Sequence, residues 1–129
     1  MRANELIFLV VDDEDLIREL NRNTLQSSYP GCTVTEFNDG TELARYDGQA
    51  HLYLLDNRMS NMDGLEALDI RRKLGDTTPA LWITGSPEDL GSRRLPMNTN
   101  VLYKPYPPKQ LQIAVEMILT QHYGQIEKA

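Results

Sequence analysis

The sequence of 129 residues contains one cysteine, Cys32, and no long hydrophobic run. A single cysteine cannot form an internal disulfide, which excludes a disulfide-stabilised secreted scaffold and fits a reducing compartment. The longest uninterrupted apolar stretch is Leu6 to Val11, far short of the ~20 residues that a membrane-spanning helix needs. The N-terminal residues do not resemble a signal peptide, so we expect a cytoplasmic protein that does not contact a membrane.

Positive charge is also scarce, because 13 Lys and Arg residues stand against 19 Asp and Glu residues, a formal net charge of −6. Binding to a phosphate backbone requires clustered positive charge, so this balance argues against a direct nucleic-acid partner. Hydrophobic residues make up 40% and charged residues 25% of the chain, as in an ordinary globular protein. Since one domain usually takes ~100–200 residues, we expect a single acidic domain.

Short apolar runs alternate with helical patterns along the whole chain. The first run is continuously apolar, which indicates burial on both faces as in the middle of a parallel sheet. The second is more polar and is placed at a sheet edge. Because a (β/α)₈ barrel needs ~250 residues, this alternation predicts an α/β fold with an open, doubly wound parallel sheet. The predicted strands cover residues 6–11, 33–37, 51–55, 79–83 and 101–103.

Each predicted strand is followed by a helical segment, and the fourth of these is expected to be short. Ser86 is a good N-cap and is followed by proline, but Gly91 weakens the helix and Pro96 ends it. A last amphipathic helix begins at Pro107, and residues 124–129 are expected to fray.

Chemically capable side chains stand where the predicted strands end. Asp12 and Asp13 follow the first strand, Asp56 the third, Thr84 the fourth and Lys104 the fifth. In an open α/β sheet the functional site lies beyond the carboxyl ends of the strands, so we expect these side chains to meet.

Carboxylates gathered in one pocket repel each other and favour a bound cation, for which oxygen ligands without a Cys/His cluster indicate Mg²⁺. A hydroxyl and an ammonium nearby could bind the oxygens of a phosphoryl group. An Asp carboxylate can itself act as the nucleophile and form an acyl phosphate.

Five motifs occur at the strand ends and in the loops that follow them: Val-Val-Asp-Asp-Glu at 10–14, Leu-Leu-Asp-Asn-Arg-Met at 54–59, Met-Asp-Gly at 62–64, Ile-Thr-Gly at 83–85 and Lys-Pro-Tyr at 104–106. Together they resemble the receiver domain of bacterial two-component response regulators. The resemblance implies a flavodoxin-like fold with five parallel strands in the order 2-1-3-4-5 and helices on both faces. It also implies a receiver domain over residues 1–124, with 125–129 as a frayed tail or the start of a linker.

By this resemblance, Asp56 would accept a phosphoryl group from a histidine kinase or a histidine phosphotransfer protein. Mg²⁺ would be held by Asp56, by Asp13 directly, by Asp12 through water and by the backbone carbonyl of Arg58. Such a domain catalyses only its own phosphorylation and slow dephosphorylation, and is not an enzyme with a separate substrate. The sequence does not indicate the output partner.

The resemblance also assigns Thr84 and Lys104 to two phosphoryl oxygens and implies a cis peptide bond before Pro105. Three features depart from the family pattern. Ser60 stands where the family often has a proline, after the Met of the third loop. The position that usually holds a switching Tyr or Phe is Val101, and the fourth helix, commonly part of the output face, is short. The phosphorylation chemistry is therefore expected to be intact, while the way in which it is reported is expected to differ.

Three alternative functions can be weighed on particular residues. An aspartyl-phosphate hydrolase of the haloacid-dehalogenase type carries a second Asp two residues after its nucleophile, where this chain has Arg58, and it needs a cap domain. A flavodoxin would bind its cofactor phosphate at the first strand-to-helix turn, which here is acidic and lacks glycine. A degenerate receiver that acts as an unphosphorylated interaction scaffold is kept as an alternative because of Val101.

Overall fold

The computed structural model describes residues 1–128, and its centre is one sheet of five parallel strands. The order across the sheet is β2-β1-β3-β4-β5, as predicted, with β2 at one edge. Since all strands run in the same direction, their carboxyl ends lie at one edge of the sheet. The strands are β1 (Ile7–Val11), β2 (Thr33–Phe37), β3 (Leu52–Asp56), β4 (Ala80–Thr84) and β5 (Thr99–Tyr103).

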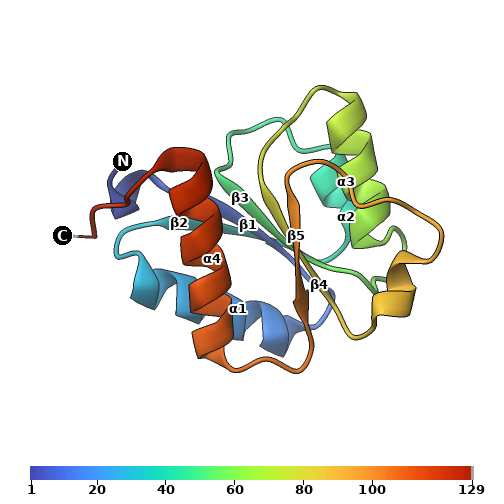
Figure 1. The fold of residues 1–129 in the computed structure, drawn as a ribbon, viewed down its shortest axis with the longest axis horizontal. Helices are drawn as coiled ribbons and strands as arrows, with labels where there is room; N and C mark the ends of the chain where they lie inside the picture. The colour runs from blue at the N-terminus through green and yellow to red at the C-terminus, as the bar shows by residue number, and fades with distance from the viewer. Residues whose placement is uncertain (129) are drawn as a thin grey trace.

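Helices cover both faces of the sheet, which confirms the doubly wound architecture. They are α1 (Asp15–Ser28), α2 (Gly40–Ala44), α3 (Gly64–Lys73) and α4 (Pro108–Tyr123). Helices α1 and α4 lie on one face, and α2 and α3 lie on the other (Figure 1). Within residues 1–128, no helix combines the length and the apolar content needed to cross a membrane.

The core consists of two apolar clusters, one on each face of the sheet. Successive side chains of a strand point to opposite faces, so Phe8 and Val10 belong to one cluster, while Leu9 and Val11 belong to the other. The first cluster is closed by residues of α1 and α4, namely Leu25, Leu111, Val115, Ile118 and Leu119. The second is closed by residues of α2 and α3, namely Leu43, Ala67 and Leu68.

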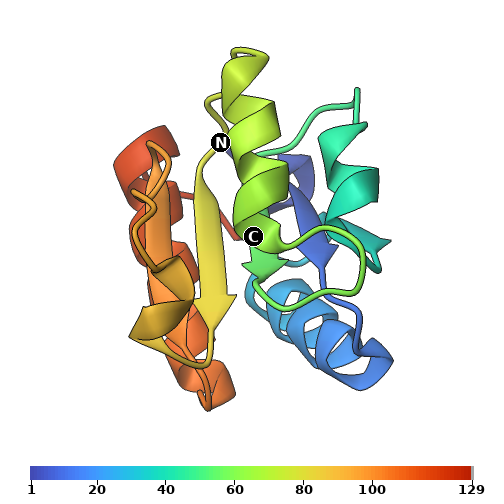
Figure 2. The same ribbon diagram turned by 90° about the vertical axis from the view of Figure 1, so that its right-hand side faces the viewer.

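The helix between β4 and β5 is even shorter than predicted, because it is a single 3-10 turn, η2 (Pro87–Leu90). Ser86 caps this turn as predicted, since its hydroxyl accepts a hydrogen bond from the Glu88 N–H at 3.2 Å. The turn ends at Gly91, whose φ of 60° lies in the left-handed region that favours glycine. In Figure 2 this turn lies beside the arrowhead of β4, so it borders the edge of the sheet at which the carboxyl ends of the strands lie.

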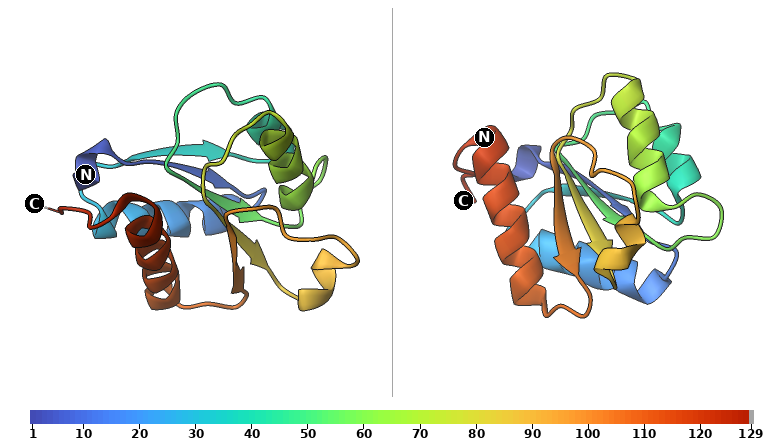
Figure 3. Two further views of the ribbon diagram at one scale, coloured as in Figure 1. Left: turned by 45° about the horizontal axis from the view of Figure 1, so that its top comes forward. Right: turned by 45° about the vertical axis from the view of Figure 1, so that its right-hand side comes forward.

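The two ends of the chain lie side by side (Figure 3), and this differs from the frayed tail expected for residues 124–129. The Ala3 N–H donates to the Glu127 carbonyl at 2.7 Å, and the Glu127 N–H donates to the Met1 carbonyl at 2.9 Å. Ile126 packs against the first core cluster. These contacts hold residues 125–128 on the domain, while Ala129 lies outside the described residues.

Candidate functional site

Three carboxylates meet at the carboxyl edge of the sheet. Asp12 follows β1 directly, Asp13 follows it, and Asp56 is the last residue of β3. One oxygen of each lies within 4.8 Å of the others, a spacing at which one divalent cation can be bound by all three. Asp12 and Asp56 are 3% and 4% exposed, whereas Asp13 is open to solvent. The strand-end prediction for these three residues therefore agrees with their placement.

Hydrogen bonds fix the loop that carries the first two carboxylates. The side chain of Asp12 accepts from the Glu14 N–H at 2.9 Å, and its carbonyl accepts from Arg18 Nη1 of α1 at 2.7 Å. Arg18 also forms ion pairs with Asp15 and with Glu36 of β2. The loop is thus tied both to the helix that follows it and to the neighbouring strand.

The electrostatics of the site favour a cation. Burial, followed by the negative charge of Asp56, raises the pKa of Asp12 from 3.8 to about 6, against the opposing hydrogen bond from the Glu14 N–H. Burial also raises the pKa of Asp56, while Lys104 acts to lower it. Buried like charges are costly unless a positive charge compensates them, so these donors fit a hard divalent ion such as Mg²⁺.

Lys104 supplies one positive charge to the site. Its Nζ forms an ion pair with Oδ1 of Asp56. Burial acts to lower the pKa of Lys104, but the hydrogen bond and the charge of Asp56 outweigh it and raise that pKa. The Lys104 N–H donates to the Thr84 carbonyl at 2.9 Å, and the peptide bond between Lys104 and Pro105 is cis, as the resemblance implied.

Thr84 reaches the same edge, but its hydroxyl points to a residue that the sequence analysis did not single out. The Thr84 side chain donates to the carboxylate of Asp89, in η2, and Thr84 is 1% exposed. Arg58 Nη2 also donates to Asp89, at 3.2 Å. The pKa of Asp89 is lowered by the hydrogen bond from Thr84, with a further contribution from Arg58. A shallow cavity of about 330 Å³ is lined by Asp56, Arg58, Thr84 and Lys104 among others.

Two further residues near Asp56 were also missed in the prediction of the site. Asn57 follows Asp56, is 6% exposed, and accepts a hydrogen bond from Trp82 Nε1 at 3.1 Å. Trp82 is 1% exposed and lies in the core. An isolated Asn after an Asp is typical of a turn, so the sequence offers no signal for this contact.

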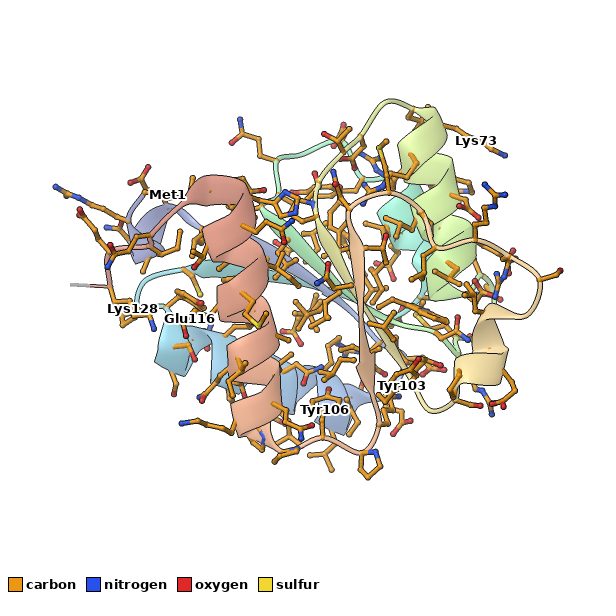
Figure 4. The ribbon with its side chains drawn as sticks, viewed as in Figure 1. Met1, Lys73, Tyr103, Tyr106, Glu116 and Lys128 are labelled. Carbon is orange, nitrogen blue, oxygen red and sulfur yellow. The ribbon has the colours of Figure 1, made fainter. Side chains whose placement is uncertain are left out.

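The loop after Lys104 is held by packing. Tyr106 lies near the start of α4 (Figure 4), and its hydroxyl donates to Oδ1 of the buried Asn21 of α1 at 2.9 Å. Tyr106 therefore orients the loop.

The comparisons with known proteins match this geometry. The sequence model of the family described as "Response regulator receiver domain" matches residues 8–116. The chain belongs to this receiver domain family. A receiver domain is a signalling domain of two-component systems, of the phosphoacceptor kind.

Known relatives contain this receiver domain within longer chains. "Sensor kinase CckA" of Brucella abortus (strain 2308) is 32% identical over 117 residues, 86% of this chain and 12% of that protein. "Uncharacterized transcriptional regulatory protein YbdJ" of Bacillus subtilis (strain 168) is 25% identical over 118 residues, 90% of this chain and 52% of that protein. The chain thus spans about half or less of these curated relatives.

A solved structure supports the same assignment of the fold. The response regulator protein TrrA of Thermotoga maritima, determined in complex with Mg²⁺-BeF, is 26% identical to this receiver domain. Its TM-score is 0.76, and the match covers 88% of this chain and 99% of that chain.

Proposed function

We propose that this receiver domain accepts a phosphoryl group on Asp56 and that Mg²⁺ is required for the transfer. The observation that carries the proposal is the surroundings of Asp56. Its buried carboxylate is paired with Lys104 on one side and lies beside Asp12 and Asp13 on the other. A buried carboxylate with these neighbours is costly without a function, and it combines a nucleophile with the charges that a phosphoryl group needs.

The metal would be held by Asp12, Asp13, Asp56 and the backbone carbonyl of Arg58. When bound, Mg²⁺ supplies positive charge to the phosphoryl oxygens and so favours their approach to a carboxylate. The close spacing of the three carboxylates and the raised pKa of Asp12 support this ligand set.

The remaining roles follow from the side chains at the strand ends. An oxygen of Asp56 forms the bond to phosphorus while the bond from phosphorus to the donor's imidazole nitrogen breaks, and that nitrogen keeps the electron pair. Lys104 Nζ, already paired with Asp56, would bind one phosphoryl oxygen, and the Thr84 hydroxyl would donate to another. The domain would catalyse only this transfer and its own slow hydrolysis.

The donor in this proposal is a histidine kinase or a histidine phosphotransfer protein, as for receiver domains in general. The proposal places the exchange in the cytoplasm, where the free thiol of Cys32 is expected to stay reduced.

The test is intact-protein mass spectrometry after incubation with acetyl phosphate and Mg²⁺. The wild type should gain one phosphoryl group, and Asp56→Asn should gain none. Asp47→Asn, which removes an exposed carboxylate elsewhere, is the matched control and should be labelled like the wild type. Stoichiometric labelling of Asp56→Asn at another residue would contradict the assignment, and an unlabelled wild type would favour the unphosphorylated scaffold.

A further inference from the structure

The carboxylate of Asp89 receives hydrogen bonds from two residues of the proposed phosphorylation site. Oγ1 of Thr84 donates to Oδ2 of Asp89, and Nη2 of Arg58 donates to Oδ1 at 3.2 Å. The Asp89 side chain is only 11% exposed, whereas that of Arg58 is 81% exposed. Asp89 thus lies between the exposed end of Arg58 and the buried hydroxyl of Thr84.

The turn that carries Asp89 is itself anchored. Nη2 of Arg93 donates to the Asp89 carbonyl at 2.9 Å, and Nη1 of the same side chain pairs with Oδ2 of Asp63 at 3.5 Å. Ser86 caps the turn at its other end. Because the backbone on both sides of Asp89 is held, its carboxylate cannot follow Thr84 unless the turn moves.

A hydroxyl group has one proton and donates to one strong acceptor at a time. In the structure that acceptor is Asp89, whereas phosphorylation of Asp56 would require the same proton at a phosphoryl oxygen. We propose that Asp89 is a positioning residue that holds Thr84 and Arg58 in the unphosphorylated arrangement and competes with the phosphoryl group for both. This inference rests on the proposed function, because it assumes that Asp56 accepts the phosphoryl group.

The competition has a structural consequence. When Thr84 donates to the phosphoryl group, Asp89 loses this hydrogen bond from β4 and keeps its ion pair with the exposed Arg58. The turn at 87–90 is then released from β4. Phosphorylation of Asp56 is thereby coupled to the conformation of the segment that stands where a longer helix was predicted.

The experiment measures beryllofluoride binding, in the presence of Mg²⁺, through the fluorescence of Trp82. This side chain is the only tryptophan and is hydrogen-bonded to Asn57, next to the acceptor. Removing the competing carboxylate with Asp89→Ala should lower the half-saturating concentration about tenfold, the ratio that ~1.4 kcal/mol supplies. Asp89→Asn keeps the shape and a weaker acceptor, and should give a smaller gain.

Two controls separate competition from general charge and folding effects. Glu88→Gln removes one negative charge from the adjacent residue of the same turn and should stay within about twofold of the wild type. In a Thr84→Ala background the Asp89→Ala substitution should give no gain, because there is no hydroxyl left to release.

The outcomes distinguish the inference from the proposed function. If the wild type binds beryllofluoride and Asp89→Ala binds it no better, the inference is wrong and the proposed function stands. An equal gain with and without the Thr84 hydroxyl would show a simple charge effect and would also overturn the inference. If neither the wild type nor any variant binds, the proposed function fails and the inference fails with it.

Discussion

Replacing Gly64 with alanine should destabilise the domain and disturb Asp56, the proposed acceptor, because this glycine allows α3 to start against the end of β3. The Gly64 N–H donates to the Asn57 carbonyl at 3.2 Å. A Cβ added at Gly64 would lie 2.5 Å from the backbone oxygen of Asp56 and 3.3 Å from Cβ of Leu55. Both neighbours belong to the fully buried strand β3, so the helix and the strand would have to separate.

The size of the effect follows from two opposing contributions. Alanine gains up to about 1 kcal/mol over glycine as a helix former, and somewhat less at a helix start. Forcing extra atoms into a packed interface costs about 1–3 kcal/mol, and a contact with backbone oxygen belongs at the upper end. The net loss is then ~1–2 kcal/mol, which corresponds to a decrease of ~4–8 °C in the melting temperature for a chain of this length.

Calorimetry or circular dichroism would measure this shift in metal-free buffer. The control is Gly85→Ala, because an added Cβ there has no heavy atom within 4 Å, and its melting temperature should equal that of the wild type. Since the displaced atom is the carbonyl oxygen of Asp56, Gly64→Ala should also bind Mg²⁺ less tightly. If Gly64→Ala melts at or above the wild type, the close approach of α3 to β3 is not required and the reasoning is refuted.

Three other predictions concern the metal and two titrating groups. Mg²⁺ at ten times its dissociation constant should stabilise the domain by about 1.4 kcal/mol, and Asp13→Ala should abolish most of this gain in melting temperature. Burial acts to raise the pKa of Asp76, but hydrogen bonds led by those of Thr78 lower it to about 2, so stability should fall as the pH drops from 3.8 toward 2. At pH 7, Asp76→Asn should lower the free energy of unfolding, measured with urea, by ~1–2 kcal/mol. The variant should also lose less stability than the wild type as the pH falls. Burial lowers the pKa of His51, whose Nδ1 accepts from the Ile7 N–H at 3.0 Å, so folding favours the neutral ring. The contribution of His51 to the free energy of unfolding should therefore be fully present above pH 6.5 and decrease as the pH falls below it. His51→Asn, whose side chain can still accept the hydrogen bond, should not show this decrease.

The parallel sheet, its inner and edge strands and the carboxylate cluster were predictable because they depend on short-range patterns and on one topological rule, whereas the complete strand order rested on the family resemblance. The continuous apolar run that forms β1 identifies an inner strand, and the more polar run at Thr33–Phe37 identifies an edge strand. Once the strands are parallel, the residues that follow them share one edge of the sheet. Asp12 and Asp56 meet there without any need to predict a side-chain contact.

The contacts of Asp89 and of the C-terminal segment could not be predicted in the same way. Asp89 lies in the run Ser-Pro-Glu-Asp, where an acidic residue is already explained by the start of a helix. Its bond to Thr84 depends on the exact path of η2, which is set by tertiary packing. Residues 125–128 have no apolar pattern of strand length, and their bonds to the N-terminus depend on where α4 ends.

The presence of valine at position 101 bears on which contacts can carry a structural change from the site to the surface. Val101 pairs with Trp82 across β4 and β5, and its β-branched side chain is stiff about χ1, so it cannot rotate between buried and exposed positions as an aromatic ring could. Trp82 is itself fully enclosed, so a displacement passed to it through Asn57 stays inside the domain. Asp89 is different, because it connects a buried hydroxyl to an exposed guanidinium within a single turn. If phosphorylation of Asp56 draws the Thr84 hydroxyl away from Asp89, the change reaches the surface through η2, and a partner that senses the phosphorylated state in this way would contact the turn rather than the face of β5.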